Sequence, residues 1–238
     1  MSLPRRPKGE LTTVAVRCPM TAQGNSLNPI GKPRVLLADD HRMVAEGLKG
    51  LLTEEFELVG IVEDGHAMVK AARDLRPDVI VADISMPHLN GIDALAQLKQ
   101  HDPQVRVVFL TMHRDPAYAR RALQAGALGF VLKHSAPAEL VLAVRAALQG
   151  RTFIAPDLAA EVFRTASHKE ADPAKALTPR QREILQLLAE GQSAKQIAAL
   201  LNLSARTVED HKYRMMETLG IENSAELIHF AIKHGLVQ

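Results

Sequence analysis

Short apolar runs alternate with longer stretches of helical period over residues 33–150. Between and after these runs, apolar residues recur at the spacing of amphipathic helices, over 41–53, 66–75, 91–100, 115–125 and 136–149. The runs themselves are rich in Val, Ile and Leu and have the length of strands: 34–38, 57–62, 78–82, 105–110 and 129–132. Continuous apolar strands that alternate with helices are typical of a parallel sheet covered on both faces. We therefore expect a doubly wound α/β domain, (βα)5, with a five-stranded parallel sheet.

From residue 177 onward the pattern is helical only and divides into four short helices. The residues that begin or end them are, in chain order, Thr178, Gly191, Ser193, Ser204, Gly220 and then Asn223 or Ser224. Two short helices joined by a tight turn are typical of a helix-turn-helix, which binds DNA. Periodicity alone also fits a small helical bundle used for protein contacts.

Two segments lie outside the α/β and helical patterns, one before residue 33 and one between residues 150 and 177. Residues 1–32 show no sustained period and are rich in Pro, Gly, Asn and Thr, so we expect a disordered basic tail. Residues 151–176 mix apolar and polar stretches and indicate a linker with one short helix.

The net charge of +2 comes from the tail, because residues 1–34 hold six Lys or Arg against one acid, whereas 177–238 hold seven of each sign. A basic isoelectric point is therefore no argument for DNA binding here.

Composition excludes several other classes of protein. The single cysteine, Cys18, excludes an intramolecular disulfide framework and a four-cysteine zinc site. The ten histidines include no pair four residues apart, so we expect no zinc site from them either. No apolar run has the length of a membrane span, and the N-terminus lacks the apolar segment of a signal peptide. These features predict a cytoplasmic protein without a membrane partner.

Polar residues follow the predicted strands at their carboxyl ends. The first strand runs into Asp39 and Asp40, the third into Asp83, the fourth into Thr111 and the fifth into Lys133. The ends of parallel strands meet at one edge of a sheet, so three carboxylates would converge there and require a cation, most naturally Mg²⁺. A nucleophilic Asp, a cation, a Lys and a hydroxyl suit phosphoryl transfer onto a carboxylate. A helix N-cap would explain one acid of the first pair, but not both.

These residues resemble the receiver domain of two-component response regulators over residues 33–150. The resemblance rests on the acid pair, on VIVADISMPHLNGID, on VVFLTMH and on AGALGFVLK. It implies that Asp83 accepts the phosphoryl group, that Thr111 and Phe130 form the switch, and that Lys133 is the conserved lysine of the family. It also implies a metal site made by Asp39, Asp40, Asp83 and the backbone carbonyl of Ser85. His134 stands where many receivers have Pro, and an inactive receiver remains an alternative.

The C-terminal segment resembles the LuxR-type helix-turn-helix of the NarL/FixJ response regulators. The matching motifs are LTPRQREIL, G-x-S-x-K-x-I-A from Gly191, and L-S-x-x-T-V-x-x-H from Leu203. An acidic pair, Glu209-Asp210, departs from the Lys that many members carry, and it lowers the attraction to phosphates. The residues expected to contact DNA are Lys195, Ser204, Arg206, Thr207, Glu209, Lys212, Tyr213 and Arg214.

Together, the two resemblances predict a phosphorylation-switched DNA-binding transcription regulator. The implied partners are a sensor histidine kinase, double-stranded promoter DNA and a second copy of the chain, with RNA polymerase as a further candidate. Because the receiver acts only on its own Asp, we do not expect an enzyme. Two alternatives keep the same fold: a regulator that works without phosphorylation, and a protein-interaction adaptor.

Overall fold

The computed structural model describes residues 31–135, 137–165 and 176–237, so almost all of the expected tail lies outside the described residues. Every strand and helix expected over 33–150 is present, with ends that differ by no more than two residues. The order is β1 (Arg34–Ala38), α1 (Arg42–Glu55), β2 (Glu57–Val62), α2 (Gly65–Leu75), β3 (Val79–Ala82), α3 (Gly91–His101), β4 (Val107–Thr111), α4 (Pro116–Gln124), β5 (Gly129–Leu132) and α5 (Pro137–Leu148).

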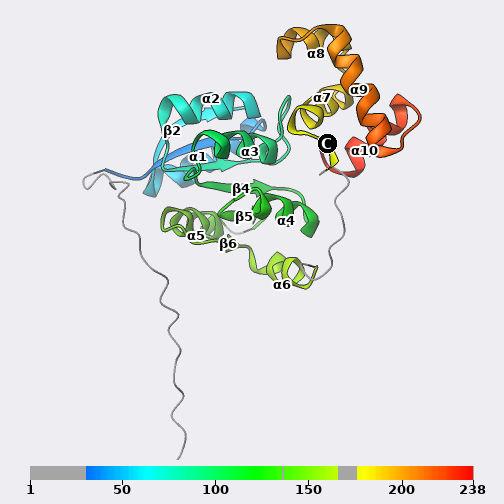
Figure 1. Cartoon of the computed structure of the whole chain (residues 1–238). Helices are drawn as coiled ribbons and strands as arrows, with labels where there is room; N and C mark the ends of the chain where they lie inside the picture. The colour runs from blue at the N-terminus through cyan, green and yellow to red at the C-terminus, as the bar shows by residue number, and fades with distance from the viewer. Residues whose placement is uncertain (1–30, 136, 166–175, 238) are drawn as a thin grey trace, which may run out of the picture. The chain divides into compact units, whose positions relative to one another are not determined.

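The strands form one parallel sheet in the order β2-β1-β3-β4-β5-β6 (Figure 1). From β1 the chain adds β2 on one side and then returns to add β3 and the later strands on the other. In open sheets of this kind, ligands bind at the carboxyl ends of the strands where the direction reverses. The topology therefore points to the ends of β1 and β3.

A sixth strand corrects the expected sheet of five. The short β6 (Phe153–Ile154) pairs with β5 in parallel, and α6 (Pro156–Thr165) follows it. Leu158 and Val162 of α6 are buried in the same core cluster as the sheet. Residues 151–165 therefore belong to the α/β fold rather than to a linker, and residues 166–175 lie outside the described residues. A two-residue strand is too short to show a period of its own in the sequence.

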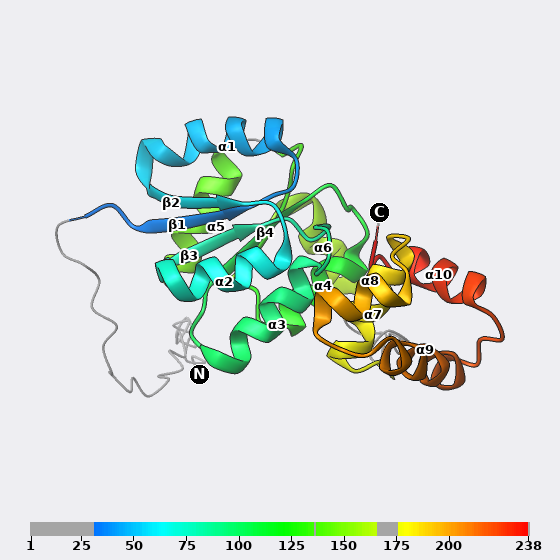
Figure 2. The same cartoon turned by 90° about the horizontal axis from the view of Figure 1, so that it is seen from above.

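Helices cover both faces of the sheet (Figure 2). Helices α1 and α5 pack on one face through residues such as Leu52 and Leu140, and α2, α3 and α4 pack on the other. The residues of β3 and β4 are all buried, which explains why their sequences are apolar without alternation. This packing fixes the strand ends that carry the polar residues.

The C-terminal helices follow the start and stop signals of the sequence: α7 (Pro179–Ala189), α8 (Ala194–Leu201), α9 (Ala205–Leu219) and α10 (Ser224–Lys233). Thr178 and Ser193 each form a capping box, in which the cap side chain and the Gln three residues later accept from each other's backbone N–H. Gly220 ends α9 at φ 66°, a left-handed conformation that favours glycine. The four helices share a core cluster of their own.

Polar side chains of α7 bond to the loop between β3 and α3, within one compact unit that begins at Lys32. The Gln186 side chain is 1% exposed; its Nε2 donates to the carbonyl of Met86 at 2.8 Å, and its Oε1 accepts from the N–H of Asn90 at 2.8 Å. Arg182 pairs with Asp93 at 2.7 Å. These bonds explain why polar residues of an amphipathic helix are buried.

Candidate phosphorylation site and helix-turn-helix

The sheet brings the expected pocket residues together at its carboxyl edge. Asp39 and Asp40 follow β1, Asp83 follows β3, Thr111 ends β4 and Lys133 follows β5. Asp39 is 1% exposed, Asp83 3% and Thr111 0%, so these polar groups are withdrawn from solvent. Burial of two carboxylates side by side is costly unless positive charge lies between them.

Lys133 supplies that charge. Its Nζ lies 2.8 Å from Asp39 Oδ2 and 2.6 Å from Asp83 Oδ2, so one ammonium bridges both carboxylates. Burial lowers the pKa of Lys133, but the charges and hydrogen bonds of Asp83 and Asp39 outweigh it and raise the pKa above its ordinary value. Lys133 is therefore charged at neutral pH. The Lys133–His134 peptide bond is trans, although His stands where many receivers have Pro.

Asp83 lies in an environment that resists ionisation. Burial raises the pKa of Asp83 above its ordinary value, and the Lys133 charge and hydrogen bond offset part of that rise. Its Oδ1 accepts from the N–H of Ser85 at 3.3 Å, a weak contact. Gly91, in the motif that follows Asp83, is required by space, because a Cβ there would collide with the Asp83 carbonyl oxygen.

The structure separates the roles of the two adjacent acids. Neither is the N-cap of α1: that position belongs to His41, whose side chain makes no cap hydrogen bond. Asp39 uses both oxygens inside the protein, since Oδ1 accepts from the N–H of His41 at 2.9 Å and Oδ2 faces Lys133. In contrast, Oδ1 of Asp40 is a buried atom without a hydrogen-bond partner among the described residues.

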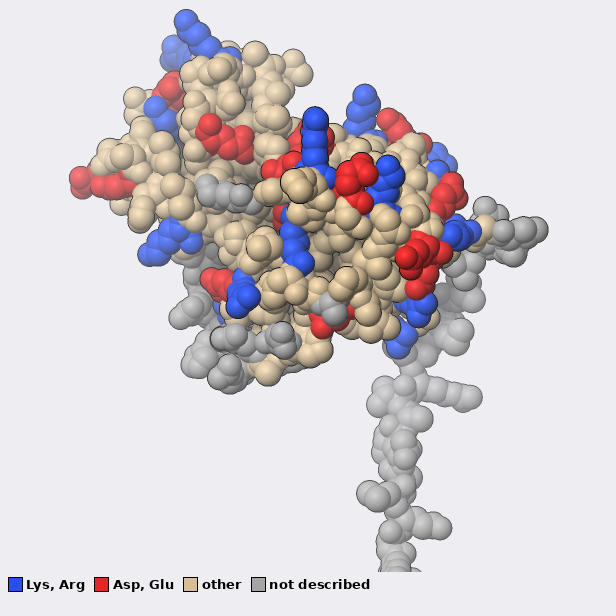
Figure 3. Space-filling view, turned by 180° about the vertical axis from the view of Figure 1, so that it is seen from behind, with Lys and Arg blue, Asp and Glu red and all other residues tan. Residues whose placement is uncertain are grey.

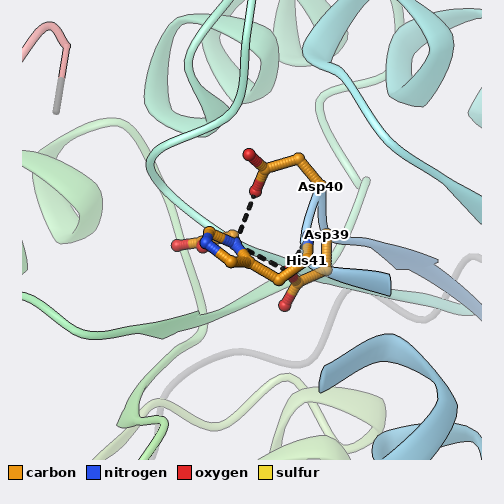
Figure 4. A group of neighbouring side chains, drawn as sticks. Asp39, Asp40 and His41 are labelled. Atoms are coloured by element: carbon orange, nitrogen blue, oxygen red, sulfur yellow. Dashed lines mark hydrogen bonds and ion pairs between the residues drawn. The ribbon is translucent and has the colours of Figure 1, made fainter. Parts of the chain in front are cut away.

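This set of atoms fits a divalent cation. Ligand atoms of Asp39, Asp40, His41 and Asp83 all lie within 4.8 Å of one another. Three of these residues offer carboxylate oxygens, the donors that Mg²⁺ prefers. Oδ1 of Asp40 contacts His41 Nδ1 at 2.9 Å but makes no hydrogen bond among the described residues, so this oxygen can serve as a ligand atom. Figure 4 shows how the Asp40 carboxylate and the His41 ring face each other at the end of β1.

The side chains of Ser85 and His113 form a hydrogen bond beside the acidic pocket that could not be predicted from the sequence. Ser85 Oγ lies 2.6 Å from His113 Nε2, which joins the loops after β3 and β4. The His113 ring stacks on Tyr118 of α4, with centroids 4.1 Å apart. Burial lowers the pKa of His113, against the opposing charges of Asp83 and Asp115, so the ring is neutral at neutral pH. Spacing alone gives no signal for this pair, because 28 residues separate its members.

The two expected switch residues occupy different surroundings. Phe130 is fully buried in the core cluster that also holds α2, α3 and α4. Thr111 is buried, and its Oγ1 accepts from the N–H of His113 at 3.2 Å. The Thr111 hydroxyl thus contacts the loop that leads into α4.

Helix α9 presents the expected recognition residues on a solvent face. Its opposite side holds Val208 and Met215, which are 1% and 0% exposed. Tyr213 is 64% exposed. Ser204 caps α9 by accepting from the N–H of Thr207 at 3.0 Å, so these two hydroxyls form the helix start. The remaining exposed residues of the expected set are Lys195, Arg206 and Arg214.

The charges of this face partly cancel. Lys212 Nζ lies 2.7 Å from Glu209 Oε2 one turn earlier, and only 20% of the Lys212 side chain is exposed. Figure 3 shows the whole molecule from behind, with positive and negative side chains interspersed over that face. We infer that electrostatic attraction to DNA by one such module is weak.

A doubly wound domain with this acidic pocket, joined to a helix-turn-helix, defines the class of two-component response regulators. Residues 35–145 match the response regulator receiver domain, and residues 175–231 match the luxR family of bacterial regulatory proteins. The chain belongs to the NarL/FixJ-type response regulators. No helix among the described residues is long and apolar enough to cross a membrane.

Individual relatives match most of the chain. Response regulator UvrY of Escherichia coli strain K12 is 34% identical over 206 residues, which cover 85% of this chain and 94% of that protein. Transcriptional regulatory protein MctR of Rhizobium johnstonii is 36% identical over 208 residues, which cover 87% and 96%. A structure of RcsB from Salmonella enterica serovar Typhimurium, bound to promoter P1flhDC with phosphomimetic BeF3⁻, is 31% identical with a TM-score of 0.57, and covers 84% of this chain and 98% of RcsB.

Proposed function

We propose that Asp83 accepts a phosphoryl group from a sensor histidine kinase and that this modification controls binding of promoter DNA by α8 and α9. The observation that carries the proposal is the Lys133 ammonium, 2.6 Å from Asp83 and 2.8 Å from Asp39. A buried carboxylate pair held by one lysine, beside the Asp40 carboxylate, suits the binding of anionic phosphoryl oxygens and a cation. The location implied by these partners is the cytoplasm.

Each residue of the pocket has a separate role in the proposed phosphoryl transfer. A carboxylate oxygen of Asp83 attacks phosphorus, the P–N bond to the kinase histidine breaks, and the electron pair remains on the imidazole nitrogen, which then takes up a proton. Lys133 can hold a phosphoryl oxygen, and the Thr111 hydroxyl can donate to another. Asp40, Asp83 and the Ser85 carbonyl would hold Mg²⁺, which supplies positive charge opposite the phosphoryl oxygens.

Hydrolysis of the acyl phosphate is a separate reaction that removes the phosphoryl group and restores the Asp83 carboxylate. A water oxygen attacks phosphorus, the bond to Asp83 breaks with its electron pair on the carboxylate, and a proton passes to solvent. The chain therefore transfers a phosphoryl group only to and from itself. We propose a signalling role rather than turnover of a metabolite.

Weak electrostatics in the DNA-binding module favour two copies at the promoter. The segment 177–238 holds seven residues of each sign, and Lys212 is already paired with Glu209. Two linked modules bind a pair of half-sites far more tightly than one module binds one. A structure of two RcsB dimers bound to two parallel DNAs, 30% identical to this chain, supports the same arrangement here. We therefore propose a homodimer on DNA.

The test compares wild type with Asp83→Asn in the full chain. We expect acetyl phosphate and Mg²⁺ to add one phosphoryl group to wild type by intact-mass spectrometry, and none to the variant. The phosphorylated wild type should protect promoter DNA in footprinting at lower concentration than the untreated protein, and the variant should not respond. A variant that is modified at the wild-type yield would refute Asp83 as the acceptor. Equal DNA protection by phosphorylated and untreated protein would favour the phosphorylation-independent regulator. Absence of DNA protection in both states would favour the protein-interaction adaptor.

A further inference from the structure

His41 brings an imidazole nitrogen to the acidic pocket. Its Nδ1 lies 2.9 Å from Oδ1 of Asp40 and 3.5 Å from Oδ1 of Asp39. Figure 4 shows the ring turned toward the Asp40 carboxylate from the residue directly after it. The ring does not serve α1 as a cap, because the His41 side chain makes no cap hydrogen bond. Its position is therefore not explained by helix formation.

The contacts of the other pocket atoms show which atoms near His41 could bind a cation. Lys133 faces Oδ2 of both Asp39 and Asp83, and the His41 N–H bonds the other oxygen of Asp39. Oδ1 of Asp40 is a buried atom that makes no hydrogen bond among the described residues, and it faces Nδ1 of His41 in an ion-pair contact. These two atoms contact each other in the structure, and both belong to the group of four side chains whose ligand atoms lie within 4.8 Å of one another.

Their separation suits two neighbouring ligands of one cation. An octahedral ion with bonds of about 2.1 Å holds adjacent ligand atoms about 3.0 Å apart. The Asp40–His41 separation is 2.9 Å, and the four candidate ligand atoms lie within 4.8 Å of one another. An imidazole nitrogen is a common ligand of first-row transition metals and a poor one for Mg²⁺.

We propose that His41 Nδ1 is a direct ligand of the divalent cation, next to Asp40, and that it raises the affinity of the pocket for first-row transition metals relative to Mg²⁺, with Mn²⁺ as the spectroscopic probe. This inference rests on the proposed cation site of the receiver and adds a nitrogen ligand to its oxygens. The competing explanation is that the His41 ring serves Asp40 only as a polar neighbour and leaves when the cation binds.

Pulsed electron paramagnetic resonance of Mn²⁺ bound to the full chain separates these explanations. A coordinated imidazole couples its ¹⁴N nucleus to the Mn²⁺ electrons, whereas a distant ring does not. We expect this coupling in wild type and its loss in His41→Ala. The matched control is His113→Ala, which removes the other imidazole near Asp83 and should keep the coupling. Titrations should show Mn²⁺ affinity falling at least about tenfold in His41→Ala, with Mg²⁺ affinity falling much less.

Other results of these measurements would contradict either the ligand role of His41 or the cation site itself. Bound Mn²⁺ without ¹⁴N coupling in wild type, or equal losses of Mn²⁺ and Mg²⁺ affinity in His41→Ala, would overturn the ligand role of His41 and leave the cation site intact. Coupling that persists in His41→Ala but disappears in His113→Ala would overturn it too, in favour of His113. An unchanged Mn²⁺ affinity in Asp40→Ala would instead contradict the proposed cation site itself. His41→Asn repeats the test with a polar side chain in case the alanine variant folds poorly.

Discussion

At the scale of single residues, Lys133 balances the charge of the acidic edge. Its side chain is 5% exposed and contacts Asp39 and Asp83, which are 1% and 3% exposed. Loss of one member of a buried ion pair leaves the other charge without compensation, and this costs far more than loss of a surface pair. Asp39 thus stabilises the position of Lys133, while Asp83 is the proposed phosphoryl acceptor.

We expect Lys133→Ala to lower the free energy of unfolding by about 3–5 kcal/mol near neutral pH. Burial already raises the pKa of Asp83, and loss of the ammonium raises it further. A raised carboxyl pKa favours the protonated folded state, so this penalty appears as pH rises through the folded pKa and shrinks as pH falls. Urea unfolding at neutral and acidic pH measures both effects.

The control is Lys49→Ala, which removes a surface pair with Glu46 at 3.5 Å and should cost no more than about 1 kcal/mol. The bridging role of Lys133 would be wrong if both lysine variants lost the same free energy of unfolding. It would also be wrong if the loss in Lys133→Ala were the same at neutral and acidic pH.

At the scale of elements, α9 is divided into a packed side and a solvent side. Val208 and Met215, seven residues apart, fix the packed side in the helical core. Arg206, Tyr213 and Arg214 are exposed on the rest of the helix. Lys212 lies between these regions, where its ammonium pairs with Glu209. The element therefore offers a mixed surface to DNA, with one of its cations already engaged.

We predict opposite effects for the two partners of this pair. Lys212→Ala should weaken binding of target DNA by about 1–3 kcal/mol per half-site contact. Glu209→Ala removes a negative charge and frees the Lys212 ammonium, so affinity should rise for target and scrambled duplexes alike. Binding titrations at several salt concentrations measure both. Glu217→Ala, an exposed acid near the end of the same helix, controls for a general change in charge.

A loss of discrimination at one base pair in Glu209→Ala would instead assign Glu209 to base reading. Unchanged affinities of both variants on both duplexes would remove this helix from the DNA contact.

At the scale of the whole molecule, the receiver and the DNA-binding helices carry different parts of one function. The receiver holds the proposed phosphorylation site, whereas the segment 177–238 has seven residues of each sign and little net attraction for DNA. Affinity sufficient for a promoter then depends on bringing two modules together.

Beryllofluoride-treated protein should therefore bind a duplex with two half-sites at least about 100-fold more tightly than a duplex with one. Fluorescence anisotropy with the two duplexes measures the ratio, and sedimentation gives the number of chains bound. Asp83→Asn treated in the same way is the control and should show a much smaller ratio. Equal affinity for one and two half-sites would mean that a single module suffices, against the proposed dimer.

The elements and the order of the pocket residues can be predicted from the sequence. Strands follow from short continuous apolar runs, helices from a period of 3.6 residues, and the capping boxes at Thr178 and Ser193 from spacing within one turn. The convergence of Asp39, Asp83 and Lys133 follows as well, because parallel strands all end at one edge. These are local rules, or rules of one sheet, and they need no distant partner.

The contacts that those groups make with one another depend on tertiary packing and could not be predicted from the sequence. The bridge from Lys133 to two carboxylates, the bond from Ser85 to His113 and the turn of His41 toward Asp40 each depend on side-chain directions at separate loops. The pairing of β6 with β5 likewise depends on an edge that exists only after the sheet forms. A period along the chain records which side of an element is buried, whereas these contacts depend on where the element packs.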